Sequence, residues 1–397
     1  MDFHSLLILM VIVYSAGKIF RYFHLPVLFG ELLGGIIAGP VLLGLVQPGD
    51  EIIKVIAELG IFFLMLHSGL ETDPRDLMKS FKSSTLVALG GVILPFGLGY
   101  FVTRYFGYDV MTSAFVAMGV SITAIALCVR LFKDYGLTKT KAFHVAMGAA
   151  MVDDIVSLIM FSVIIGIVET GGFEPVALGI LLVKVVLFFA VIMWAGFKLA
   201  KHLNRLIYSG NRGFTVTLII ALIIGLLAEA IGLHIIIGAF LAGLFIREEI
   251  IDSKAFHKIE DRVYGMAYFF FGPVFFASLA FHLDFTIFIE DPWYLVALIV
   301  VSVVGKLFGC GLIARFLKLS KWESLAVGIG MNSRGAVELI IASIGISLGI
   351  INETIFSALV IMAFVTTLMS ILMMKPVAKH LTLKGKAKDK LASVLHR

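Results

Sequence analysis

Long apolar runs alternate with short polar or Gly/Pro-containing segments along almost the entire chain of 397 residues. At about 20 residues for each crossing of the hydrocarbon core, a dozen or more spans account for most of this length. The pattern predicts an all-α polytopic membrane protein with thirteen transmembrane helices, numbered below in chain order. Their centres lie near residues 13, 37, 62, 94, 121, 154, 187, 223, 241, 271, 304, 335 and 365. The first run lacks the basic start and cleavage site of a signal peptide, and we expect it to be retained.

The positions of lysine and arginine support this helix count and orient the chain. Of the 32 basic residues, Lys54 and Arg104 alone fall in one set of alternate loops, and Lys184, Lys306 and Arg334 fall inside spans. The remaining 27 lie in the other set. Because cytoplasmic loops carry the excess of basic residues, we expect an outside N-terminus and a cytoplasmic C-terminus in the plasma (inner) membrane.

Composition excludes several classes of protein. Hydrophobic residues make up 60% of the chain and charged residues only 15%, with a mean hydropathy of +1.05. No length remains for a soluble domain of ordinary size, which excludes a cytosolic enzyme. The net charge of +5 is scattered along the chain and does not suggest nucleic-acid binding. We interpret Cys128 and Cys310, which lie in apolar stretches, as buried free thiols, and no cofactor is expected.

Two pairs of motifs indicate an internal repeat. Residues 34–39 and 238–243 share the pattern G-x-x-x-A-G, and residues 62–71 share Phe-Phe, six residues, then Leu-acid with residues 275–284. The matching helices are seven spans apart, so they cross the membrane in opposite directions, as in the inverted repeats of secondary transporters. The predicted divisions are a first repeat of helices 1–6 over residues 1–172, a linker helix over 173–205, a second repeat of helices 8–13 over 206–381, and a short basic cytoplasmic tail over 382–397.

Three ionisable residues are predicted at the middle of the membrane. Asp153 and Asp154 lie in the sixth helix and Lys306 in the eleventh. Each lies about 20 Å along its helix from the end at which that helix enters the membrane. Adjacent residues on a helix diverge by about 100°, so one aspartate can face Lys306 while the other faces a water-filled cavity. A charge in hydrocarbon is costly and therefore indicates a cation or proton site, although a static Asp–Lys pair between the two helices remains an alternative.

Two spans contain residues that disfavour a continuous helix. They are residues 119–124 in the fifth helix and residues 328–335 in the twelfth. Unwinding there would free backbone carbonyls for a small cation, with Ser121, Thr123 and Asn332 as further oxygen donors. The alternative is that these small residues only allow close helix packing. Arg334 and Glu338, four residues apart, are predicted to form either a structural pair or part of a gate.

The remaining acidic and basic residues of the spans carry weaker signals. Glu31 follows a Pro-x-x-x-Gly turn and is predicted near the inner face of the membrane. Glu58, Glu71, Lys184 and Glu229 are predicted to lie off the midplane or near helix ends, where their head groups can reach the membrane surface. We interpret most of them as structural.

Residues 26–39, 63–71, 152–154 and 330–339 together resemble the monovalent cation:proton antiporter-2 family, and the resemblance covers nearly the whole chain. It is closest to the sodium/proton antiporter branch, in which the sixth helix carries two adjacent aspartates. The resemblance implies a homodimer in which helices 4, 5, 6, 11, 12 and 13 move as a core against a scaffold. It also implies that Asp154 binds Na⁺ and protons, that Asp153 pairs with Lys306 when sodium is absent, and that the crossing of helices 5 and 12 completes the site.

The resulting functional hypothesis is a secondary active transporter that exchanges sodium, or lithium, for protons by elevator-type alternating access. The resemblance implies two protons per sodium ion and therefore net charge movement. A potassium/proton antiporter of the same family stays open, as do a cation channel and a sensor that has lost transport. An intramembrane aspartyl protease is disfavoured because its two aspartates must lie on facing helices, and no enzymatic activity is expected. The predicted partners are a monovalent cation, protons, the lipid bilayer and a second copy of the chain.

Overall fold

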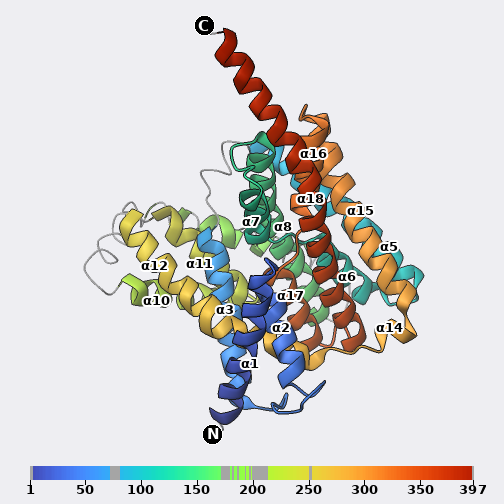
Figure 1. Ribbon diagram of the computed structural model, residues 1–397. Coiled ribbons are helices and arrows are strands. Elements are labelled where there is room, and N and C mark those ends of the chain that lie inside the picture. Colours follow the sequence, from blue (N-terminus) through green and yellow to red (C-terminus); the bar gives the residue numbers. More distant parts are fainter. Residues whose placement is uncertain are drawn as a thin grey trace. The chain divides into compact units, whose positions relative to one another are not determined.

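The computed structural model describes residues 3–71, 81–170, 213–249 and 253–395, with short helical pieces between residues 179 and 198. All regular structure in these ranges is helical (Figure 1). Within the described part of the chain, ten helices are long and apolar enough to cross a membrane, and three shorter apolar helices cover residues 27–38, 183–192 and 235–246. Each predicted centre falls in one of these helices. Because the three shorter helices have fewer than the roughly 20 residues needed for a crossing, the number of thirteen crossings stays a prediction.

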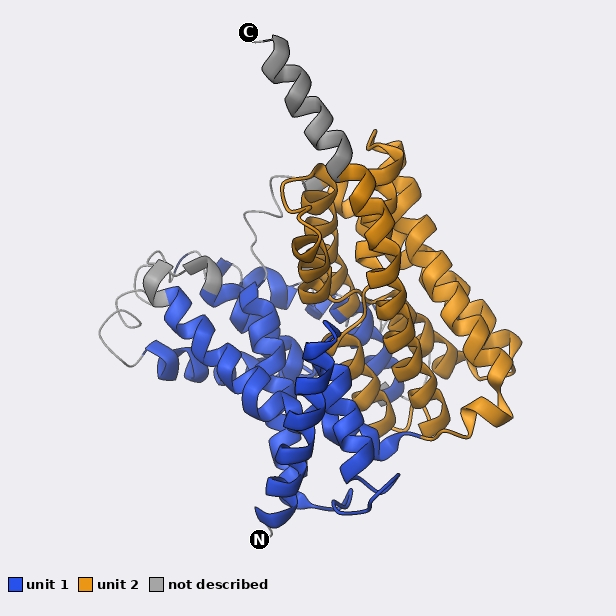
Figure 2. Ribbon diagram, viewed as in Figure 1, with its two compact units in different colours: residues 1–75, 158–283 blue, residues 76–157, 284–397 orange. Residues whose placement is uncertain are grey.

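The chain divides into two compact units (Figure 2). Unit 1 comprises residues 1–75 and 158–283, and unit 2 comprises residues 76–157 and 284–397. Unit 2 therefore contains the fourth, fifth, eleventh, twelfth and thirteenth predicted helices and the first part of the sixth. The predicted repeat boundaries divide the chain along its sequence and remain a prediction. Much of the predicted linker helix, 173–205, lies outside the described residues.

Unit 1 is built from helices that contact one another through glycine. The G-x-x-x-A-G motif places Gly34 so close to α1 that a Cβ atom there would lie 2.7 Å from Cα of Val13. A Cβ atom on Gly243, in the second copy of the motif, would lie 2.2 Å from the carbonyl oxygen of Leu66. The motif therefore provides backbone-to-backbone helix contacts. The elements are α1 (Phe3–Tyr22), α2 (Val27–Ala38), α3 (Glu51–Glu71), α10 (Gly213–Ala230), α11 (Ile235–Glu249), α12 (Ser253–Met266), the π-helical segment η1 (Ala267–Phe271), α13 (Gly272–Leu279) and η2 (Ala280–His282).

Unit 2 contains the interrupted helices and the candidate site. Its elements are α5 (Phe81–Tyr105), α6 (Val110–Ser121), α7 (Ile125–Asp134), α8 (Lys141–Thr170, to Ser157), α14 (Ile287–Glu290), α15 (Pro292–Phe316), α16 (Lys321–Met331), α17 (Ala336–Ser347) and α18 (Glu353–Leu395). Cys128 and Cys310 are buried free thiols in its core, as predicted. Helix α18 continues through Leu395, so most of the predicted tail is helical.

Glycine also determines how closely α5 and α15 approach. A Cβ atom on Gly309 would lie 2.3 Å from the carbonyl oxygen of Gly90, and one on Gly91 would lie 2.3 Å from Sγ of Cys310. One turn earlier on α15, a Cβ atom on Gly305 would lie 2.6 Å from Cα of Pro95. This packing holds Lys306, the neighbour of Gly305, in the interior of unit 2.

Both predicted helix interruptions are confirmed. Helix α6 begins at its N-cap Asp109, ends at Ser121 and is followed by extended backbone at Ile122, before α7 starts at Ile125. Helix α16 starts after a capping box formed by Ser320 and Glu323 and ends at Met331, and α17 resumes at Ala336. Each interruption leaves a helix C-terminus and a helix N-terminus inside the unit, where their backbone groups need partners.

Candidate functional site

The two interrupted segments contact each other directly. The backbone amide of Ala124 donates a hydrogen bond to the carbonyl oxygen of Ser333 at 2.9 Å. The Thr123 hydroxyl donates to the carbonyl oxygen of Met331, the last residue of α16, at 2.8 Å. Gly335 is required by this proximity, because a Cβ atom there would lie 2.8 Å from Cβ of Ala124. The predicted crossing of the fifth and twelfth helices is therefore present.

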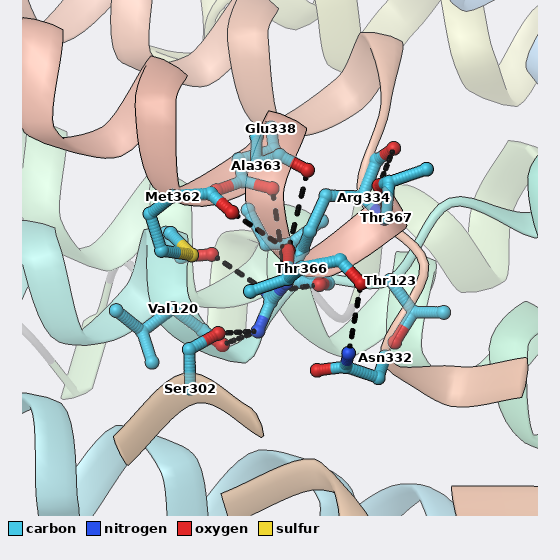
Figure 3. A network of polar contacts seen from close by, with 12 residues as sticks. Val120, Thr123, Ser302, Asn332, Arg334, Glu338, Met362, Ala363, Thr366 and Thr367 are labelled. Atoms are coloured by element: carbon cyan, nitrogen blue, oxygen red, sulfur yellow. Dashed lines mark hydrogen bonds and ion pairs between the residues drawn. The ribbon is translucent and has the colours of Figure 1, made fainter. Parts of the chain in front are cut away.

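Arg334 binds the end of the opposite interrupted helix (Figure 3). Its side chain is fully buried, and its guanidinium donates to the carbonyl oxygens of Gly119 (3.1 Å), Val120 and Ile122. A further bond goes to the Ser302 hydroxyl at 2.7 Å. A cation at a helix C-terminus is favourable because the unpaired carbonyls carry partial negative charge. Arginine suits this position because its rigid fork offers five donors.

This arrangement corrects one expectation from the sequence. The carbonyls freed at the end of α6 were predicted to be available to a small cation, whereas in this structure the guanidinium of Arg334 binds them. The physical reason is charge: a guanidinium satisfies the same acceptors that a metal cation would use, and it is covalently fixed on α16–α17. The predicted pair with Glu338 is present, at 3.9 Å between Nε of Arg334 and Oε2 of Glu338.

Ser121, Thr123 and Asn332 lie in the interior, but their hydroxyl and amide groups have different partners. The Ser121 hydroxyl bonds to the carbonyl of Met118 in its own helix at 2.7 Å, so it does not reach across the crossing. Thr123 bridges to α16 as described and also interacts with Asp153. The Asn332 amide nitrogen donates to Thr366 and Ser370 of α18, while its Oδ1 atom is buried without a hydrogen-bond donor among the described residues. Thr123 and Asn332 thus keep roles at the crossing.

Asp153 and Lys306 form an ion pair in the same unit. The ammonium of Lys306 lies 3.3 Å from Oδ1 and 3.5 Å from Oδ2 of Asp153, and both side chains have no solvent exposure. Ala149 and Ala150, just before the aspartates on α8, carry only a methyl group and are fully buried. The geometry matches the expectation that one of the two aspartates faces Lys306.

Asp154 is also buried, with 2% of its surface exposed. Among the described residues of unit 2, the buried Asp, Glu, Lys and Arg side chains are three carboxylic acids, Asp153, Asp154 and Glu338, and two bases, Lys306 and Arg334. With all five ionised, the interior would hold one excess negative charge. Since an uncompensated charge in such surroundings is costly, one proton or one small monovalent cation would balance the set.

Four polar residues of the site were not predicted from the sequence. Ser302 bonds Arg334, Thr367 bonds both the amide and the carbonyl of Arg334, and Thr366 and Ser370 receive the Asn332 amide. Two signals were available. Ser302 precedes Lys306 by one helical turn, and the three α18 residues lie within five positions of one another in an otherwise apolar helix.

Comparison with known proteins defines the family. A family model described as "Sodium/hydrogen exchanger, transmembrane" matches residues 6–380. The chain belongs to this family of membrane transporters and is not an enzyme. The Na(+)/H(+)-K(+) antiporter GerN of Bacillus cereus is 34% identical over 354 residues, covering 88% of this chain and 89% of the relative. The Na(+)/H(+) antiporter of Enterococcus hirae is 31% identical over 379 residues, covering 94% and 98%.

The fold is also found in a solved structure. The sodium proton antiporter MjNhaP1 from Methanocaldococcus jannaschii, at pH 8, superimposes with a TM-score of 0.74 over 95% of this chain and 96% of that chain. The sequence identity is 18%, so this likeness shows a shared fold.

Proposed function

We propose that this protein is a secondary active antiporter that exchanges sodium ions for protons across a membrane. Membership of the sodium/hydrogen exchanger family supports the reaction class, and the names of the Bacillus and Enterococcus relatives support sodium as the cation. The paired aspartates favour the antiporter-2 branch of cation:proton exchangers.

The charge balance of unit 2 carries the proposal. Its buried acids exceed its buried bases by one among the described residues, so one proton or one sodium ion completes the balance, and the two compete for the same negative charge. Antiport requires such competition, because the transporter must carry sodium in one direction and protons in the other through the same site. A channel needs no exclusive occupancy of this kind.

The two aspartates have separate roles in this proposal. Asp154 binds the sodium ion, with Asp153 as a second carboxylate. When sodium is absent, Asp153 pairs with Lys306, which matches the observed separation of 3.3 Å. Sodium entry releases Asp153 from Lys306, and the ammonium can then lose its proton. Thr123 and Asn332 support the site at the helix crossing.

Reconstituted liposomes test this proposal. With a proton gradient imposed, the lumenal pH is followed by dye after addition of Na⁺, Li⁺ or K⁺. We expect Na⁺ to dissipate the gradient in the wild type and not in Asp154→Asn. The matched control is Asp134→Asn, which removes an exposed carboxylate at the end of α7. A response to Na⁺ that survives in Asp154→Asn would contradict the assigned site, and a wild type unresponsive to all three ions would favour a sensor.

Net charge movement is the second part of the proposal and goes beyond the one-for-one balance, because Lys306 releases a second proton when sodium binds. Two protons exchanged for one sodium ion move one charge, which couples to about 2.3 kcal/mol per 100 mV of membrane potential. We expect exchange to accelerate when the potential drives the net charge. Lys306→Gln removes one of the titratable groups, and its exchange should become insensitive to potential. Equal rates at all potentials in the wild type would indicate electroneutral exchange.

Potassium is the second candidate cation, because the name of the Bacillus relative includes K(+). Competition between Na⁺ and K⁺ in the liposome assay separates the two. If K⁺ alone dissipates the gradient, the protein is a potassium/proton antiporter.

The remaining parts of the proposal concern assembly and movement. We expect a homodimer in the plasma (inner) membrane with an outside N-terminus, and unit 2 moving against unit 1 in an elevator-type cycle. The separation of the chain into two compact units supports this mechanism. Chemical cross-linking in membranes tests the dimer, and terminal tags read from each side test the orientation.

A further inference from the structure

A cavity of about 430 Å³ lies within unit 1, and none of its lining residues belongs to the proposed ion site. Helix α1 forms one wall, Val27 and Glu31 of α2 form another, and Tyr268, Phe269 and Pro273 close it. The α1 wall consists of Met10, Val13, Tyr14, Gly17, Lys18 and Arg21. These positions recur every three or four residues, so they share one face of the helix.

The α1 wall changes character along its length. Met10 and Val13 are apolar, whereas Lys18 and Arg21, two to three turns further along, are exposed cations. From Met10 to Arg21 the wall extends about 16 Å at 1.5 Å per residue. An amphiphile with an apolar tail and a polar head matches this polarity.

Glu31 gives the cavity a carboxyl group near its basic end. Only 8% of Glu31 is exposed. Arg21 interacts with it electrostatically. A Cβ atom on Gly17 would lie 3.1 Å from Cγ1 of Val27, so the glycine leaves room for this neighbouring wall residue. A charged carboxylate is costly to bury, so a ligand that donates hydrogen bonds to Glu31 is favoured.

We propose that this cavity binds phosphatidylethanolamine. The lipid phosphate interacts with Lys18 and Arg21, the primary ammonium donates hydrogen bonds to Glu31, and one acyl chain lies along Met10, Val13 and Phe269. Phosphatidylcholine has the same phosphate, but its quaternary ammonium has no N–H to donate. Phosphatidylglycerol has no cation for Glu31. The charge pattern of two bases and one buried acid therefore selects the ethanolamine head group.

Native mass spectrometry of the purified full chain, titrated with each of the three lipids, tests the proposal. Because a hydrogen bond to a charged group is comparatively strong, we expect phosphatidylethanolamine to bind roughly tenfold more tightly than the other two. Glycerophosphoethanolamine, which has the head group without acyl chains, should not bind at the same concentrations. Equal binding of the three lipids by the wild type would overturn the proposal without any variant, as would a preference for phosphatidylglycerol.

Two variants with matched controls locate the site. Glu31→Gln should abolish the preference for phosphatidylethanolamine, while Glu58→Gln, an exposed acid of α3, should keep it. The double variant Lys18→Gln/Arg21→Gln should weaken all three phospholipids, while Lys54→Gln should not. An unchanged lipid preference in a folded Glu31→Gln protein, verified by size-exclusion chromatography, would overturn the assignment.

Discussion

The guanidinium of Arg334 lies 3.1 Å from the carbonyl oxygen of Gly119. A residue at one helix interruption therefore donates a hydrogen bond to the C-terminal end of the other interrupted helix, α6. The same side chain binds two further carbonyls at this end and one hydroxyl of α15. Arg334 therefore joins α6, α15 and the α16–α17 crossing. A helix interruption at the candidate site is stable only if its backbone groups are satisfied in this way.

Removing this arginine should strongly destabilise the protein. Arg334→Gln leaves Glu338 without its ion pair and the α6 carbonyls with fewer donors, so we expect a loss of about 3 to 5 kcal/mol, as for a broken buried ion pair. Thermal unfolding in detergent measures the effect. Arg130→Gln, in an exposed pair with Asp134, is the control and should have little effect. Unfolding of Arg334→Gln at the wild-type temperature would contradict the role assigned to the guanidinium.

Asp153 and Lys306 should show energetic coupling. Asp153→Asn and Lys306→Gln each leave one buried charge without its opposite, whereas the double variant removes both charges. We expect the double variant to be more stable than the sum of the single effects implies, with a coupling of about 0.5 to 3 kcal/mol. Unfolding of the four proteins gives the cycle. Additive effects would show that the observed pair contributes nothing to stability.

Thr123 and Ser121 should behave differently although both were predicted as oxygen donors. Thr123→Val removes the bond to Met331 that joins the crossing segments, at a cost of about 1 kcal/mol in stability, and should slow exchange. Ser121→Ala removes only a bond within α6 and should leave exchange near the wild-type rate. Liposome assays of the two variants make the comparison. If Ser121→Ala is the slower variant, its hydroxyl has a role that its position in this structure does not explain.

The α5–α15 contact should not accept a methyl group. In Gly309→Ala the new Cβ atom would meet the carbonyl oxygen of Gly90, so the helices must separate, at a cost of about 1 to 3 kcal/mol. The displacement would move Lys306, and exchange should fall as well. Gly97→Ala on α5 is the control, because a Cβ atom there would meet nothing within 4 Å. Equal stability of the two variants would contradict the close approach.

Asp284 should contribute a pH-dependent term to stability. The amide of Thr286, together with the hydroxyls of Thr286 and Thr354, donates to its carboxylate and lowers the pKa of Asp284 below its ordinary value of 3.8. A lowered pKa stabilises the folded protein above the ordinary value, and this contribution is lost as the pH falls through the folded pKa.

The comparison of wild type with Asp284→Asn tests this term. The wild type should be the more stable protein at about pH 6, and the difference should shrink towards about pH 3. Thermal unfolding across this range measures it. A difference that is constant with pH would show that protonation of Asp284 is not responsible.

The sequence by itself determined the helical membrane class and the location of the critical charges. Apolar runs of spanning length and the cost of charge in hydrocarbon are local properties, so the order of residues alone singles out Asp153, Asp154, Lys306 and Arg334. The two helix interruptions could also be predicted from the sequence, because Gly, Ser and Asn disfavour helix interiors whatever the tertiary fold.

Only the tertiary structure decided which groups meet. Arg334 and Gly119 are 215 residues apart in the chain, and nothing near either residue indicates that the guanidinium binds the α6 carbonyls. Ser121 bonds within its own helix and Thr123 across the crossing, a difference set by the direction of each side chain in the folded protein. The sequence did not single out Glu31, because its cavity is formed by residues 10–31 together with residues 268–273, which are far apart in the chain. Local physics therefore identifies the costly groups, whereas their partners depend on long-range packing.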